Sequence, residues 1–281
     1  MRKGFKKIIS HRNFIIIIIF FFVILLLFTL FLPPAVDWSH YYRPAATEFI
    51  NGRSPYSVEG FINPPWVLIP MLPLLLLPES LSRAILALGM MISLVFVSKK
   101  MGANLVSSLI LLLSPPVIQL FIDGNIDWIV ALGFFLPPQI GLFFIALKPQ
   151  LGLFLAIYWL ISSWRLGGIR EVFRVFTPFL LVLIATFLVY GFYPLNHVEH
   201  LAWGGNTSLW PLSIPIGLAL FAHSLRKNDQ NFSILASPCF SPYLILHSWV
   251  GVLLVLSRYK WEFAVSVIGL WIIVVIRALN L

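Results

Sequence analysis

Asp37 is the first polar group able to do chemistry after a long apolar run. The chain has only 10 acidic residues in 281, and 60% of it is hydrophobic. A carboxylate in this place can accept a proton from a hydroxyl group, as a general base does. It can also cap the helix that follows, because aspartate is among the residues most favoured at an N-cap. Spacing alone favours the cap, and the two roles are compatible.

Four more polar residues stand between apolar stretches: Asn125, Asp127, Lys148 and His247. Asn125 and Asp127 can hydrogen-bond a sugar or cap a helix. Lys148 can contact an anionic group of a ligand, or it can snorkel from a helix end toward water. For His247 a buried, hydrogen-bonded side chain is favoured over contact with a substrate.

The stretch 37–65 is the longest part of the chain that is not oily. Tyr41 and Tyr42 can form a platform for a sugar ring. Arg43 and Arg53 can hold a phosphate, or they can balance Glu48 and Glu59. A loop at 193–208 adds His197, Glu199 and His200, but two histidines three residues apart are common in loops. We therefore predict no metal site.

Apolar and aromatic residues from Trp38 to Ile50 recur with helical spacing. The pattern predicts a helix that lies flat in the membrane interface with its aromatic face toward lipid. Pro44 predicts a kink or two short helices, and Gly52 supplies a stop.

The composition excludes an ordinary soluble protein, because charged residues make up only 10% of the chain and about 25% of a typical globular domain. We predict an all-α, polytopic transmembrane bundle that forms a single domain over residues 1–281. At about 20 residues per crossing it has room for roughly eight to ten membrane segments. The net charge of +9 fits the positive-inside rule and anionic membrane lipids better than nucleic acid.

The apolar run 14–32 predicts an uncleaved first span with a cytoplasmic N-terminus, which places the loop 33–63 outside the cell membrane. Residues 64–78 contain five prolines and are predicted to be a tilted short span or, preferably, a re-entrant piece. Prolines also predict short, broken helices in 105–122, 128–161 and 232–256. The basic stretch 164–174 is predicted to be a cytoplasmic loop.

The order of these motifs resembles the polytopic glycosyltransferases of the GT-C type, and most closely glycosyltransferase family 87. The first loop carries most of the resemblance, and weaker fragments follow in order along the chain. The matching residues are Asp37, Tyr41, Tyr42, Ala45, Ala46, Gly52, Ser54, Pro55, Tyr56, Pro64 and Pro65, then Gly124, Asn125, Lys148, Pro149, Gln150, Ala236, Ser237 and Pro238.

The resemblance implies a sugar transferase that uses a polyprenyl-phosphate donor, most commonly of mannose. The acceptor would be a hydroxyl group of a lipid glycan, a polysaccharide or a protein. Asp37 would be the general base of an inverting reaction, and no cofactor would be needed. The residues expected to bind substrate are Tyr41, Tyr42, Arg43, Arg53, Tyr56, Asn125, Asp127, Lys148 and His247.

The chain is shorter than typical members of that family, so a second hypothesis stays open. In it the protein is a non-catalytic polytopic subunit that contacts a protein partner or lipid through its first loop. The missing internal repeat disfavours a third hypothesis, a transporter.

Overall fold

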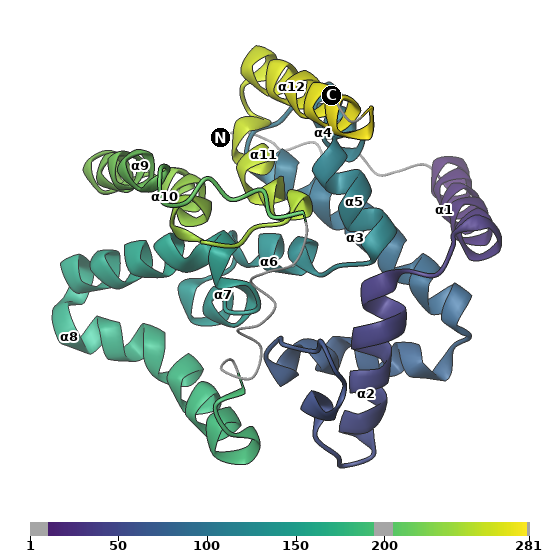
Figure 1. Ribbon diagram of the computed structural model, residues 1–281, viewed down its shortest axis with the longest axis horizontal. Coiled ribbons are helices and arrows are strands. Elements are labelled where there is room, and N and C mark those ends of the chain that lie inside the picture. The colour runs from purple at the N-terminus through teal and green to yellow at the C-terminus, as the bar shows by residue number, and fades with distance from the viewer. Residues whose placement is uncertain (1–10, 194–204, 280–281) are drawn as a thin grey trace.

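The computed structural model describes residues 11–193 and 205–279, and that part of the chain is helical without a strand (Figure 1). The elements are α1 (His11–Phe31), η1 (Asp37–Tyr42), α2 (Arg43–Ile50), η2 (Pro55–Ser57), η3 (Pro65–Leu76), α3 (Glu79–Lys100), α4 (Leu105–Leu112), α5 (Pro115–Asp123), α6 (Asp127–Gly133), α7 (Pro138–Ile145), α8 (Pro149–Tyr190), α9 (Ile214–Lys227), α10 (Asn231–Ala236), η5 (Ser237–Phe240), η6 (Leu246–Trp249), α11 (Val250–Leu256) and α12 (Lys260–Ala278).

Among the described residues, α3, α8 and α12 are long and apolar enough to cross a membrane. A fourth span results if α4 and α5, which are bent by 54° at their junction, are counted together. The all-helical class and the presence of apolar spans are therefore confirmed. The larger number of membrane segments stays a prediction.

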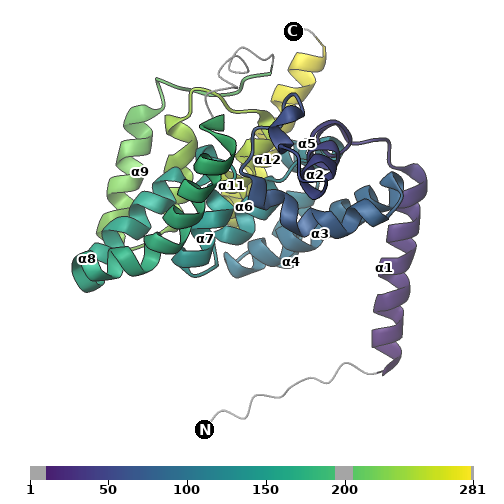
Figure 2. The ribbon, with the colours of Figure 1, turned by 90° about the horizontal axis from the view of Figure 1, so that it is seen from below.

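Helix α1 stands apart from the rest of the bundle (Figure 2). It packs against α3, and most of its apolar side chains are exposed, such as Phe31 at 75%. An apolar surface of this extent is unfavourable in water, because burial of apolar area is the main stabilising term in folding. The surface is suited to lipid.

Prolines and glycines divide the middle of the chain into short helices, as predicted. Pro115 begins α5, Pro138 begins α7 and Pro149 begins α8, each in the first turn, where a missing N–H costs nothing. Helix α7 packs against both α6 and α8. The turns between these helices carry polar groups into the interior.

The chain breaks inside the predicted loop at 164–174, but most of these residues are helical and belong to α8. Two helical arms of α8 meet at Gly167 and Gly168, which have non-helical backbone angles, and Figure 1 shows the sharp change of direction. The residues around the two glycines, such as Arg165, Leu166 and Arg170, favour helix. Charge identified a polar segment here but not its conformation.

The aromatic stripe of the first loop faces protein, which corrects the prediction that it lies against lipid. Trp38, Tyr42, Ala45 and Ala46 are all buried, and α2 packs against η3. The Trp38 indole donates a hydrogen bond of 3.1 Å to the Ser82 hydroxyl on α3. Periodicity identified the buried face, but the partner could not be read from it.

The expected kink at Pro44 takes the form of a change in helix type. A π-helical turn, η1, ends at Tyr42, and α2 begins at Arg43 with Pro44 in its first turn. Gly52 follows α2 with a φ of +72°, in keeping with the predicted stop. The first residue of this assembly is Asp37, which the π-helical turn presents to the interior.

Candidate functional site

A cavity of about 430 Å³ lies where five distant parts of the chain meet. The parts are the first loop, the turn between α5 and α6, the turn between α7 and α8, the residues that follow α8, and the segment that leads into η6. The polar side chains that line it are Asp37, Tyr41, Tyr42, Asn63, Asp123, Asn125, Lys148, Gln150, Tyr193, Tyr243 and His247. Six of these, Asp37, Tyr41, Tyr42, Asn125, Lys148 and His247, were predicted to be in the site.

Asp37 occupies the first position of η1 and points its carboxylate at Asn125. The amide of Asn125 donates a hydrogen bond to Oδ2 of Asp37. Val36 stands at the N-cap position, and no side chain caps this turn. The preferred interpretation of Asp37 as an N-cap is therefore wrong.

Asn125 is held in one orientation by its neighbours. Its Oδ1 accepts hydrogen bonds of 2.6 Å from the Lys148 ammonium and 2.6 Å from the backbone N–H of Ile126. Since the oxygen is occupied on that side, the amide NH₂ faces Asp37. Gly124, with a φ of +69°, makes the preceding turn, and a Cβ there would lie 2.7 Å from the Cβ of Ala35.

Lys148 turns inward from the junction of α7 and α8, so the snorkelling interpretation is wrong. The residue is 8% exposed, and its ammonium lies 2.5 Å from Oδ1 of Asp127. A lysine has three donor hydrogens, and two of them face Asn125 and Asp127. The third is left for a ligand in the cavity.

Asp127 joins Lys148 to His247, because its other oxygen lies 2.7 Å from Nδ1 of His247. Asp127 and His247 are completely buried. The backbone N–H of His247 donates to the Gln119 side chain at 3.1 Å. Within the described residues, Nε2 of His247 has no hydrogen-bond partner. The expected buried, hydrogen-bonded histidine is thus confirmed, and it also lines the cavity.

The walls of the cavity are tied together by Tyr42 and Asn63. The Tyr42 hydroxyl donates to Oδ1 of Asn63 at 3.1 Å, and the Asn63 amide donates to the Leu147 carbonyl at 2.9 Å. These bonds link the first loop to the turn that carries Lys148. Tyr41 lines the same cavity beside Gly60.

Four residues predicted to bind substrate do not line the cavity. Asp127 is completely buried and contacts Lys148 and His247, and the other three lie elsewhere. Arg43 is occupied by the Ser82 hydroxyl at 3.3 Å and the Leu77 carbonyl at 3.1 Å. Arg53 pairs with Glu48 beside a second cavity of about 370 Å³. Tyr56 stacks on Tyr193, with ring centroids 4.4 Å apart, and so supports a cavity wall from behind. For Arg43 and Arg53, sequence proximity to Asp37 was a poor guide, because Arg53 pairs within the loop and Arg43 with Ser82 and Leu77 beyond it.

Asp123, Asn63, Tyr193 and Tyr243 also line the cavity and were not predicted as site residues. Asp123 opens the polar stretch 123–127, so the same signal that identified Asn125 could have identified it. Nothing in the sequence marks Tyr193 or Tyr243, since tyrosine is common wherever one end of a side chain is wet.

Burial raises the pKa of Asp37 above its ordinary value, and the nearby Lys148 and the Asn125 hydrogen bond offset part of this effect. Burial disfavours the charged form, whereas a cation and a donor favour it. A raised pKa makes a carboxylate a stronger base, which suits proton abstraction near neutral pH.

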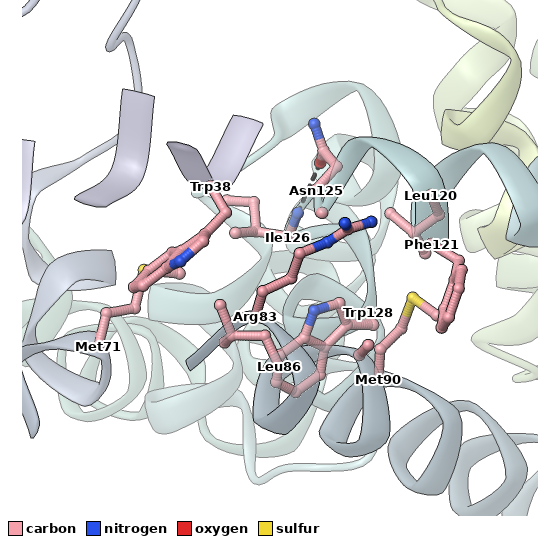
Figure 3. A pocket seen from close by; sticks show the side chains of 12 residues that line it. Trp38, Met71, Arg83, Leu86, Met90, Leu120, Phe121, Asn125, Ile126 and Trp128 are labelled. Carbon is pink, nitrogen blue, oxygen red and sulfur yellow. Dashed lines mark hydrogen bonds between the residues drawn. The ribbon is translucent and has the colours of Figure 1, made fainter. Parts of the chain in front are cut away.

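Behind Asn125 lies a third, much smaller cavity of about 10 Å³ (Figure 3). This is roughly the space for one water molecule. Arg83 of α3 enters it and is 4% exposed; its Nη2 donates to the Ile122 carbonyl at 3.4 Å. Nε and Nη1 have no hydrogen-bond partner among the described residues. The guanidinium thus supports the last turn of α5, next to the turn that carries Asn125.

The predicted loop residues His197, Glu199 and His200 lie outside the described residues. In the described ranges, no group of three or more histidine, cysteine or acidic side chains is placed to hold a metal ion. No protein family, curated protein or solved structure matches the chain.

Proposed function

We propose that the protein is a membrane glycosyltransferase that moves a sugar, most plausibly mannose, from a polyprenyl-phosphate donor to an acceptor hydroxyl group. The observation that carries the proposal is the polar chain from Asp37 through Asn125, Lys148 and Asp127 to His247. Its members come from distant parts of a chain in which only 10% of residues are charged. Buried polar networks are costly, so their presence in such a protein favours a functional site.

Asp37 is the general base in this proposal. Its Oδ2 is held by Asn125, which leaves Oδ1 to accept the proton of the acceptor hydroxyl. As that oxygen attacks the anomeric carbon, a C–O bond forms on one face of the sugar. The bond from the anomeric carbon to the phosphate oxygen breaks on the opposite face, and its electron pair leaves with the phosphate. One displacement of this kind inverts the configuration.

Lys148 and His247 are placed to help the leaving phosphate. The third N–H of the Lys148 ammonium is available for a phosphate oxygen, since Asn125 and Asp127 occupy the other two. Asp127 holds the His247 ring through Nδ1, and the buried Nε2 has no hydrogen-bond partner among the described residues. Preorganised cations and donors at the place where charge develops are a major source of catalysis. Asp127 acts by holding these two side chains.

The GT-C-like arrangement of the helices and the orientation in the membrane are part of the same proposal. A GT-C-like bundle with its first loop on the outer side of the plasma membrane and a cytoplasmic N-terminus would bring Asp37 to a lipid-linked donor. The first loop is folded against η3 and α3, so it forms a wall of the site. Membrane lipids would surround α1, α8 and α12, whose apolar side chains are exposed.

The direct test is incubation of the purified protein with polyprenyl-phosphate-mannose and a panel of acceptor extracts. We expect mannose transfer by the wild-type protein and none above background by Asp37→Asn. Asp229→Asn is the matched control, because Asp229 pairs with Arg258 at 3.5 Å and does not line the cavity. It should transfer normally.

Retained transfer by Asp37→Asn would exclude Asp37 as the base. If the wild-type protein transfers no sugar and copurifies with a partner in fixed stoichiometry, the non-catalytic subunit is favoured instead. Thermal unfolding of both variants shows whether each is folded.

A further inference from the structure

We propose that Asp123 recognises hydroxyl groups of the donor sugar and thereby sets the sugar specificity of the site. This inference rests on the proposed function and deepens it. It assigns a role to a carboxylate that the proposed mechanism leaves unused.

Asp123 is a positioned side chain on the wall of the main cavity. It is the last residue of α5, is half-buried, and lines the cavity together with Asp37. Gln119 lies one helical turn before it on α5, so the two side chains are neighbours. Gln119 is itself fixed, because its Oε1 accepts the backbone N–H of His247 at 3.1 Å. The carboxylate therefore stands beside a fixed amide on the cavity wall.

The fold gains little from a carboxylate at this position. The C-terminal end of a helix carries a partial negative charge, so an acidic side chain is unfavourable there. Asp37 adds repulsion from across the cavity. Among the described residues, no ion pair involves Asp123. A residue that breaks a local rule without a structural gain is expected at a functional site.

The location of Asp123 fits the transferred sugar. It lines the same cavity as Asp37, Lys148 and His247, and so lies near the proposed base and the groups proposed to face the phosphate. The sugar must occupy this space, because its anomeric carbon lies between the attacking hydroxyl and the leaving phosphate. An ionised carboxylate accepts hydrogen bonds on both oxygens, which matches two neighbouring hydroxyl groups on a sugar ring.

Binding measurements can test this role without knowledge of the acceptor. Affinities of the purified full-length protein would be measured for polyprenyl phosphate and for polyprenyl-phosphate-mannose. The ratio of the two dissociation constants gives the contribution of the sugar. In Asp123→Asn and Asp123→Ala we expect that contribution to fall by about tenfold to a hundredfold, as for loss of hydrogen bonds to a charged group. The affinity for polyprenyl phosphate should be unchanged or higher, because both variants remove a negative charge from the cavity wall.

Asp229→Asn is again the control and should keep the wild-type ratio. The melting temperature separates recognition from folding: Asp123→Asn removes a repulsion, so its melting temperature should be equal to or above that of the wild type. If the ratio of the two dissociation constants is unchanged in both variants, or if both lipids lose affinity equally, Asp123 does not recognise the sugar. The proposed function is not affected by that result. If the wild-type protein binds neither lipid, the proposed function fails and this inference fails with it.

Discussion

Replacement of Asn125 by alanine should shift the pH dependence of sugar transfer toward higher pH. The Asn125 amide donates to the Asp37 carboxylate, which favours the ionised, basic form of Asp37. The substitution removes this donor and also removes an acceptor of the Lys148 ammonium. The pKa of Asp37, which burial already raises, should therefore rise further.

The size of the shift follows from the bond that is lost. A hydrogen bond to a charged group contributes about 1.5 to 3 kcal/mol, and one pKa unit corresponds to about 1.4 kcal/mol. Asp37 is half-buried, and water can replace part of the lost bond, so the lower end applies. We expect the acidic limb of the profile of kcat/KM against pH to move up by about one pH unit.

The direction of the shift can be checked at low and at high pH in the profile of kcat/KM. The base works only when it is deprotonated, so transfer falls as pH drops through its pKa. The variant should be strongly impaired below this range and should recover toward the wild-type rate above it. Asn51→Ala, at an exposed position after α2, should leave the profile in place. An equal loss of activity at every pH would refute the reasoning, because it would mean that Asn125 acts on the substrate or on folding.

Two more predictions concern the stability of the site. Lys148→Met leaves Asp127 buried without its cation, so the free energy of unfolding should fall by about 3 to 5 kcal/mol. Thermal melts of the double variant with Asp127→Asn should show that part of the loss is restored. Additive effects of the two substitutions would contradict the pairing. Gly124→Ala forces a side chain into a left-handed conformation, 2.7 Å from the Cβ of Ala35. It should lower stability by about 1 to 3 kcal/mol, whereas Gly269→Ala, which meets nothing nearby, should not lower the melting temperature.

Much of the helical framework could be predicted from hydrophobic runs and their interruptions. Pro115 and Pro149 mark helix starts because proline has no N–H to donate and suits the first turn. The helical conformation of most of residues 164–174 could not be predicted from their charge. Charged side chains indicate that a segment contacts water, and an exposed helix provides that contact as well as a loop does.

Some residues of the candidate site could be identified from the sequence, but their contacts could not. Asn125 and Lys148 were identifiable because a polar residue inside an apolar run needs a partner or a function. Their contact with each other depends on the packing of α5, α6 and α8, and no local pattern contains that information. Arg43 shows the opposite case, since it is next to Tyr42 in sequence but is taken up by Ser82 and Leu77. A long side chain can reach several partners, so its position in sequence does not fix its contact.

The charges around the cavity determine how much Lys148 can contribute to donor binding and how much to the reaction rate. Asp127 neutralises Lys148 in the unliganded site, and Asp37 and Asp123 add negative charge to the walls. In the proposed reaction an anionic donor would therefore enter a site whose cation is already paired, which would cost affinity. The same pairing would hold the ammonium where charge develops on the leaving phosphate. Binding energy that is realised mainly in the transition state raises the rate, whereas tight binding of the donor would not.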